Sequence, residues 1–248
     1  MVRILTTLFN DIIDDREYKH IKRRYKEVKR LCPSFKFQDF SSPLILSCCC
    51  MTDFKFIRYL IKKEKVDINY QIQQDDDDGI IYTTNYNTSF IEGESALMIL
   101  ALSKIGNKNR VLDIMMENGV DVNQINIYGS NALMYGIYYE DFDYCRRLIR
   151  YGSDINLKNE FGYTPLMIAY EMDKMHIFKM LIVEGADLME FMEKRGDVRD
   201  LLEVGISSLN SNKHEMREYI WRYLEDKRDF ISNQFPGGIG DSLRNYIF

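Results

Sequence analysis

The strongest constraint in this sequence is an internal repeat with a period of 33 residues. Residues 129–156 are followed by a segment that repeats the same plan. The matched pairs, each 33 positions apart (162 − 129), are Gly129 and Gly162, Leu133 and Leu166, Gly152 and Gly185, and Asp154 and Asp187. A fixed period of this length indicates a stacked repeat architecture, in which each unit buries its apolar face only against its neighbours.

Within one unit, the residue types predict a turn followed by a short helix. Gly162 suits a tight turn because glycine adopts a positive backbone φ at little cost. Thr164 and Pro165 suit a helix start, since the Thr oxygen can accept from free N–H groups and Pro has no N–H to lose. Leu166 and Ala169 are three apart and share one helix face, which we expect to pack on the neighbouring unit.

These features resemble the ankyrin repeat. The residues that carry the resemblance are Gly162, Thr164, Pro165, Leu166 and Ala169, then Leu181, Ile182, Gly185, Ala186 and Asp187. The resemblance implies an all-α repeat solenoid of helix-turn-helix units with short hairpin fingers and helical caps. It also implies a non-enzymatic protein-protein interaction module that binds its partner through a concave face. The repeats, rich in Ile, Asn, Lys and Tyr, are similar to ankyrin proteins of amoebal giant viruses and poxviruses.

The repeat pattern divides the chain into segments. We expect ankyrin repeats at 40–188 (units 40–69, 93–123, 126–156 and 159–188), an N-terminal helical cap at 1–39, an acidic insertion at 70–92, a degenerate repeat or C-terminal helical cap at 189–229 and a tail at 230–248. Gly93 lies 36 residues before Gly129 (129 − 93), whereas Gly119 lies 33 before Gly152 (152 − 119). The second unit therefore holds three extra residues, which we place in the turn between its two helices.

The first unit, 40–69, departs from the pattern in two ways. It lacks the glycine that stands two residues before the aspartate in later units, here Asp67. It also holds three adjacent cysteines, of which we expect Cys48 and Cys49 to pack as small apolar side chains rather than to bind metal or catalyse.

Composition bounds the class of protein. The 248 residues are 46% hydrophobic, enough for a continuous core, and the formal net charge of −5 disfavours general nucleic-acid binding. The five cysteines are odd in number and match no metal-ligand spacing, so we expect reduced thiols. We see no secretory signal and no membrane span, and expect an intracellular protein, in the cytoplasm or nucleus of the host cell if it is viral.

Residues 1–31 read as helical, with Ile21, Tyr25 and Val28 at helical spacing. Basic residues surround this stripe: Lys19, Lys22, Arg23, Arg24, Lys26, Lys29 and Arg30. We favour a terminal cap whose solvated face is basic. Nucleic-acid binding through this helix is the alternative.

Candidate partner-binding residues follow from the resemblance, since ankyrin proteins bind through finger tips and the inner face of the first helices. The candidates are Ile127, Tyr128, Tyr138, Tyr139, Glu160, Phe161, Tyr163 and Met172. The same alignment adds Ile91, Glu92, Glu94, Ile125, Ser130 and Lys158 on fingers, and Leu102, Ser103 and Glu171 at helix ends. Tyrosine is amphipathic, stiff and enriched at interface hot spots, so we expect the aromatic cluster to be the energetic centre. We expect a monomer with a protein partner.

No motif points to catalysis, a cofactor or a metal. His20, His176 and His214 have no Cys or Ser motif nearby, and His176 is expected on the surface. The tail, FPGGIGDSLRNYIF, lacks the Lys-Ser/Thr of a phosphate-binding loop. It distantly resembles the F-box-like ends of some viral ankyrin proteins. That likeness keeps a second function open, a substrate adaptor of a ubiquitin ligase whose tail recruits the ligase.

Overall fold

The structure is a computed structural model that describes residues 17–31, 43–50, 54–73, 91–103, 107–188 and 190–191, and 215–226 apart from 217, 221 and 225. The chain forms two compact units: unit 1 is Met1–Asp154 with Asn159–Phe161, and unit 2 is Ile155–Lys158 with Gly162–Phe248. The predicted tail lies outside the described residues. So do residues 74–90 of the predicted insertion, 1–16 and 32–39 of the predicted cap, and 192–214.

Helices make up the regular structure of both units. Unit 1 contains α2 (Tyr18–Leu31), α3 (Pro43–Cys50), α4 (Lys55–Tyr59) with its π-helical continuation η2 (Leu60–Glu64), α5 (Ala96–Leu102), α6 (Lys108–Glu117), α7 (Ala132–Tyr138) and α8 (Phe142–Arg150). Unit 2 contains α9 (Pro165–Glu171) and α10 (Met175–Val183). The described residues hold no strand beyond an isolated antiparallel bridge between Gln71 and Ser95. The predicted all-α repeat fold is confirmed.

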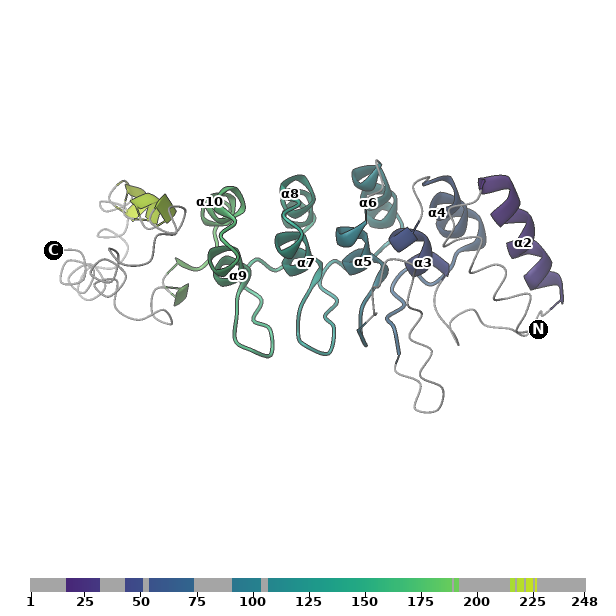
Figure 1. Cartoon of the computed structure of the whole chain (residues 1–248), viewed down its shortest axis with the longest axis horizontal. Coiled ribbons are helices and arrows are strands. Elements are labelled where there is room, and N and C mark those ends of the chain that lie inside the picture. Colours follow the sequence, from purple (N-terminus) through teal and green to yellow (C-terminus); the bar gives the residue numbers. More distant parts are fainter. Residues whose placement is uncertain are drawn as a thin grey trace. The chain divides into compact units, whose positions relative to one another are not determined.

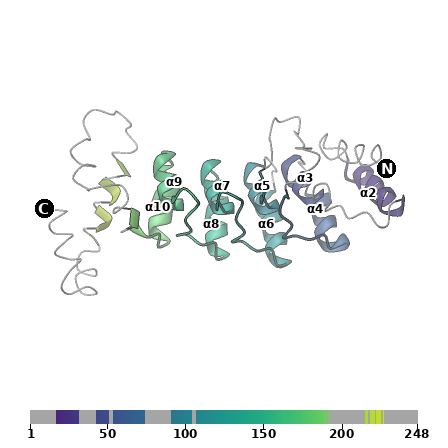
Figure 2. The same ribbon diagram turned by 90° about the horizontal axis from the view of Figure 1, so that it is seen from below.

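In unit 1 the paired helices form two rows (Figure 1). The inner row is α3, α5 and α7, and the outer row is α4, α6 and α8; Figure 2 shows the same rows from below. Contacts run along each row, from α3 to α5 to α7 and from α4 to α6 to α8. Each repeat therefore buries its apolar face against its neighbours, as the 33-residue period predicts.

The start of each inner helix follows the predicted chemistry. Gly129 and Gly162 have φ of 68° and 76°, a region that favours glycine. The Thr164 hydroxyl oxygen accepts a hydrogen bond from Met167 N at 3.3 Å, with Pro165 in the first turn of α9. Asn131 caps α7 in the same way, because its side-chain oxygen accepts a hydrogen bond from Met134 N at 3.1 Å.

The inner helix face is packed closely, as its small residues require. Leu133 and Gly136 lie on the face of α7 predicted to pack, and Leu133 is fully buried. A Cβ atom added to Gly136 would come within 2.7 Å of Cys145 Sγ, so glycine lets α7 approach α8. In unit 2, Leu166 and Ala169 are buried in the same way.

The three extra residues of the second repeat lie between the start of α5 and the end of α6. The inner helices α5 and α7 start 36 residues apart (132 − 96), whereas the outer helices α6 and α8 end 33 apart (150 − 117). Five residues lie between Leu102 and Lys108 (108 − 102 − 1), whereas three lie between Tyr138 and Phe142 (142 − 138 − 1). Two of the extra residues therefore lie in the connection between the helices, as predicted, and the third makes α6 one residue longer than α8.

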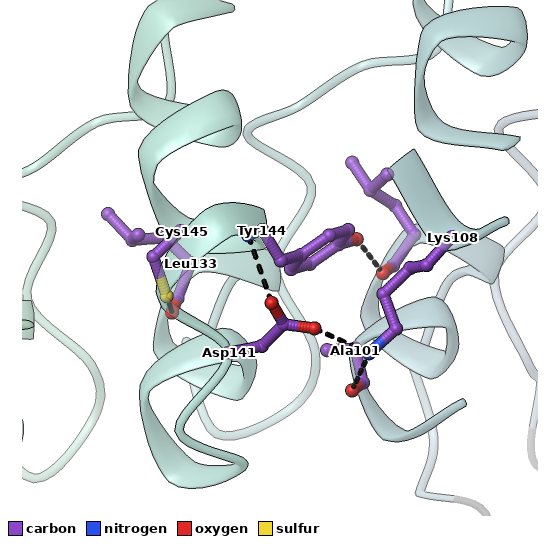
Figure 3. Close-up of polar contacts among 7 residues, drawn as sticks. Ala101, Lys108, Leu133, Asp141, Tyr144 and Cys145 are labelled. Atoms are coloured by element: carbon purple, nitrogen blue, oxygen red, sulfur yellow. Dashed lines mark hydrogen bonds and ion pairs between the residues drawn. The ribbon is translucent and has the colours of Figure 1, made fainter. Parts of the chain in front are cut away.

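A polar cluster ties the second helix pair to the third (Figure 3). Asp141 Oδ1 accepts a hydrogen bond from Tyr144 N at 3.0 Å and so caps α8. The other carboxylate oxygen, Oδ2, lies 2.7 Å from Lys108 Nζ, and Lys108 also donates to the Ala101 carbonyl at 2.9 Å. The Tyr144 hydroxyl donates to the Leu97 carbonyl at 2.6 Å. The end of α5 and the starts of α6 and α8 are thus held together.

Helix α2 packs on the outer helix of the first pair. Ile21, Tyr25 and Val28 are buried, which confirms the predicted stripe. The Tyr25 ring meets Phe56 edge-on at 5.9 Å and Tyr59 at 6.3 Å between centroids. This packing is the one that a terminal cap requires.

Candidate protein-binding surface

The finger tips of unit 1 are joined by backbone hydrogen bonds. Ile127 N donates to the Glu92 carbonyl at 3.2 Å, and Glu160 N donates to the Tyr128 carbonyl at 3.0 Å. A Cβ atom added to Gly129 would lie 3.0 Å from Glu160 N, so glycine at this position lets the two tips come close together. Successive tips are therefore registered against each other by main chain rather than by side chains alone.

One asparagine organises the tip between α6 and α7. Asn126 is buried, and its side-chain oxygen accepts from the backbone N–H groups of Tyr128 and Ser130, both at 3.0 Å. Its amide nitrogen donates to the Tyr135 hydroxyl at 3.0 Å. Asn159 holds the next tip, where its side-chain oxygen accepts from Phe161 N at 3.1 Å. The aromatic residues at both tips therefore stand on fixed backbone.

The tips present an apolar surface to solvent. Tyr128 is 43% exposed and Phe161 is 68% exposed, although their ring centroids are only 6.0 Å apart. Ile125 and Ile127 are about half exposed, and Glu160, which precedes Phe161 in the chain, is exposed. We call Ile125, Ile127, Tyr128, Glu160 and Phe161 the finger surface.

The remaining candidates are also exposed. Tyr138 and Tyr139 lie at the end of α7 in unit 1. Partial burial raises the pKa of the Tyr139 hydroxyl, with smaller contributions from Glu94 and Cys49. In unit 2, Tyr163 precedes α9 and Met172 follows it, and both side chains are exposed.

Three residues of the wider predicted set are buried, contrary to expectation. Glu94 is 3% exposed, because its carboxylate accepts from the Tyr135 hydroxyl at 2.5 Å and from Ile91 N at 2.8 Å. Ser103 follows α5 and is buried, as is Ser130, whose N–H is taken by the tip asparagine. Because they are buried, these three side chains cannot form a contact surface.

The described residues offer little for catalysis or metal binding. No group of three or more His, Cys, Asp or Glu side chains is placed there to hold a metal ion. His176 is exposed, as predicted. Cys48 and Cys145 are buried, and burial raises the pKa of both thiols, which opposes formation of a nucleophilic thiolate. Across the same part of the chain, no helix has the length and apolar character needed to cross a bilayer.

Comparisons with known proteins point to one family. A family model for ankyrin repeats (3 copies) matches residues 79–159 and 97–192. A palmitoyltransferase, AKR1, of Candida glabrata is 28% identical over 125 residues, covering 50% of this chain and 16% of that protein. An ankyrin repeat protein of fowlpox virus is 26% identical over 183 residues, covering 64% and 52%. One of Acanthamoeba polyphaga mimivirus is 35% identical over 95 residues, covering 36% and 16%.

The chain spans about half the length of the fowlpox relative and much less of the other two. Ankyrin repeats generally serve protein-protein interaction, through the extended surfaces that stacked repeats create. Since the family match falls on the segment whose helix pairs and fingers recur with the 33-residue period, residues 79–192 are ankyrin repeats, and the chain is similar to ankyrin repeat proteins of poxviruses and amoebal giant viruses.

Proposed function

We propose that this protein is a non-enzymatic module that binds a protein partner through its finger tips and the ends of its inner helices. In unit 1 the contact residues are Ile127, Tyr128, Tyr138, Tyr139, Glu160 and Phe161, and in unit 2 they are Tyr163 and Met172. The observation that carries the proposal is the exposed pair Tyr128 and Phe161, held on tips whose backbones are bonded together.

Rigid aromatic side chains favour binding for two reasons. Tyr128 and Phe161 each bury a large apolar area at a low cost in side-chain entropy. Their backbones are already ordered by Asn126, Asn159 and the inter-finger hydrogen bonds, so little conformational freedom remains to be lost on binding. Exposed apolar side chains gathered on one surface are also typical of interaction sites.

Site-specific photocrosslinking tests the proposal. The photoreactive residue p-benzoylphenylalanine would replace Tyr128 in one sample and Tyr151, which follows the outer helix α8, in a control sample. Each sample would be irradiated in cell lysate. We expect a protein adduct from position 128 that is absent from position 151. Because the finger surface is largely apolar, the adduct should persist in about 0.5 M salt, where charge pairs are screened.

A matched pair of double variants adds an energetic test. Tyr128→Ser with Phe161→Ser removes the tip aromatics, and Tyr151→Ser with Phe142→Ser removes one Tyr and one Phe at or next to α8. We expect the first pair to lower capture of the crosslinked partner at least tenfold and the second to leave it unchanged. Equal capture by both variants, with similar melting curves, would refute binding at the fingers.

The ligase-adaptor alternative depends on residues 230–248, which lie outside the described part of the chain. It predicts that deletion of this tail removes ligase subunits from the captured material while the finger-bound partner remains. Absence of ligase subunits from the intact chain would leave the adaptor role without support. We place the protein inside the cell as a monomer, to be checked by imaging and by light scattering.

A further inference from the structure

Charge is unevenly distributed along unit 1. Residues 17–31 and 54–65 contain 12 Lys and Arg residues but only three carboxylates: Glu17, Glu27 and Glu64. The whole chain, by contrast, has a formal net charge of −5. These two segments are α2 and α4 with η2, which pack against each other. These helices are therefore strongly basic in a chain that is acidic as a whole.

Four cations form a stripe along α2. Lys19, Arg23, Lys26 and Arg30 follow one another at spacings of four, three and four residues, and all are exposed. They lie on the side of the helix opposite the buried stripe centred on Tyr25. At 1.5 Å per residue the stripe is roughly 16 Å long, enough to follow several successive phosphates of a nucleic-acid strand.

Contacts with α4 and η2 fix the orientation of this stripe. Lys22 Nζ lies 5.3 Å from the ring centroid of Tyr18 and 4.6 Å from that of Tyr59. Lys29 Nζ lies 2.7 Å from Glu64 Oε2, and the Tyr59 hydroxyl donates to the same carboxylate. Because these groups hold one flank of α2 against the first repeat, the exposed flank keeps its cations in a constant arrangement.

Further exposed cations lie on or next to α4 and η2, the elements that adjoin α2. These are Lys55, Arg58, Lys62, Lys63 and Lys65. Lys62 is paired with Glu117 of α6 at 3.2 Å, and both side chains remain open to solvent. In these two segments, among described residues, Leu31 is the one exposed large apolar side chain.

We propose that the basic surface of α2, α4 and η2 binds duplex nucleic acid through its phosphates, without reading sequence. Long cationic side chains on a fixed helix suit phosphate contacts, which supply nearly all of non-specific affinity. A protein partner would need several apolar anchors, and a single strand would need exposed aromatic rings for stacking; among the described residues of this surface, Leu31 is a lone exposed large apolar side chain and no aromatic ring is classed as exposed. The apolar stripe of α2 is already buried, so the helix has no face to insert into a bilayer.

Fluorescence anisotropy with labelled 20-base-pair DNA and RNA duplexes of mixed sequence tests this proposal across a salt series. The test variant is Arg23→Gln with Arg30→Gln on α2. The control is Arg146→Gln with Arg150→Gln, two exposed arginines of α8 with the same change of charge. We expect the α2 variant to bind about tenfold more weakly at 0.1 M salt and its log-log salt slope to fall by about two, one per lost phosphate contact.

The control variant should keep the affinity and slope of the parent chain. The proposal is overturned by equal losses in both variants, by tighter binding to a single strand of the same sequence, or by no duplex binding at 0.05 M salt. It is also overturned if vesicles containing phosphatidylserine, rather than duplexes, respond to the α2 substitutions. The Tyr128→Ser and Phe161→Ser chain should bind duplexes normally, which separates this surface from the fingers.

Discussion

The Asn123 side chain forms hydrogen bonds with the backbone around Asp154, one repeat further along the chain. Its side-chain oxygen accepts from Asp154 N at 2.8 Å, and its amide nitrogen donates to the Gly152 carbonyl at 3.1 Å. Asn69 makes the same pair of bonds one repeat earlier. An amide side chain is needed because it offers an acceptor and a donor together. The Asn of each Asp-Ile-Asn or Asp-Val-Asn segment in unit 1 therefore links neighbouring repeats.

Replacement of Asn123 should weaken that link. Asn123→Ala loses both bonds, and we expect the free energy of unfolding in urea to fall by about 1–3 kcal/mol. Asn118→Ala is the matched control, because the Asn118 amide bonds only the Ile114 carbonyl of its own helix. The control should lose less of its free energy of unfolding. An equal loss in the two variants would argue against coupling between repeats.

Gly93 and Gly119 have nearly equal φ values but differ in how close their neighbours lie. Substitution of each glycine by alanine therefore separates the cost of backbone strain from the cost of steric crowding. Gly93 has φ of 80° and Gly119 has φ of 81°. A Cβ at position 93 would lie 2.8 Å from Asn126 Cα, whereas a Cβ at position 119 would meet nothing within 4 Å. We expect Gly119→Ala to cost about 1–2 kcal/mol from φ alone. Gly93→Ala should cost clearly more in the same urea titration, and equal costs would contradict close contact between fingers.

Lys65 occupies the position where later repeats have glycine. It has φ of 50° and ends η2, in the place taken by Gly119 and Gly152 in the following units. Lys65→Gly should therefore raise the melting temperature, with a gain of about 0.5–1 kcal/mol after the entropy cost of glycine is subtracted. Lys63→Gly, inside η2, should destabilise the chain instead. A loss of stability in both variants would mean that Lys65 is not strained.

Glu94 should make stability depend on pH. Burial raises the pKa of this carboxyl, against smaller opposing effects from the Tyr135 hydroxyl and the Ile91 N–H. A raised folded-state pKa means that the stabilising contribution is fully present below the unfolded pKa, near 4.3, and is lost as pH rises through the folded pKa. The unfolding free energy of the parent, minus that of Glu94→Gln, should therefore fall with rising pH and then level off.

The same series in a Tyr135→Phe background checks the cause. Loss of the hydroxyl removes a group that lowers the Glu94 pKa, so the fall should extend to higher pH. Urea titrations between about pH 4.5 and 8 measure the difference directly. A difference that stays constant with pH would show that Glu94 does not titrate abnormally in the folded chain.

Asp141 should contribute more to the stability of the folded chain than Asp143, which lies two residues further on. Asp141→Ala removes both the cap of α8 and the carboxylate beside Lys108, and we expect a loss of about 2–3 kcal/mol. Asp143→Ala changes an exposed residue in the first turn of the same helix and should cost about 0.5 kcal/mol. Thermal unfolding of both variants compares them, and similar melting temperatures would contradict the role of the cluster in Figure 3.

Much of the fold could be predicted because its rules are local. The glycine, cap and leucine positions of one 33-residue unit act within a few residues of each other, and the structure places Gly129, Asn131 and Leu133 as that pattern requires. The sequence also shows directly that the first repeat lacks the glycine two residues before Asp67. It does not show what replaces that glycine, a left-handed Lys65 after a π-helical segment.

The candidate site was only partly predictable, because burial depends on residues far apart in the chain. The alignment put Glu94 and Tyr163 in equivalent places, one residue after the glycine of each finger, yet Glu94 is buried and Tyr163 is exposed. The difference arises from the Tyr135 hydroxyl, 41 residues beyond Glu94, which supplies a hydrogen bond to the buried carboxylate. No local signal pairs these two residues.

The sequence by itself determined the repeat architecture, since helix starts, turns and apolar faces depend on short-range preferences that recur every 33 residues. Only the tertiary structure decided which side chains are exposed and which are buried. The burial of Glu94 against Tyr135 results from how neighbouring repeats pack, and packing joins residues whose separation in sequence carries no recognisable pattern.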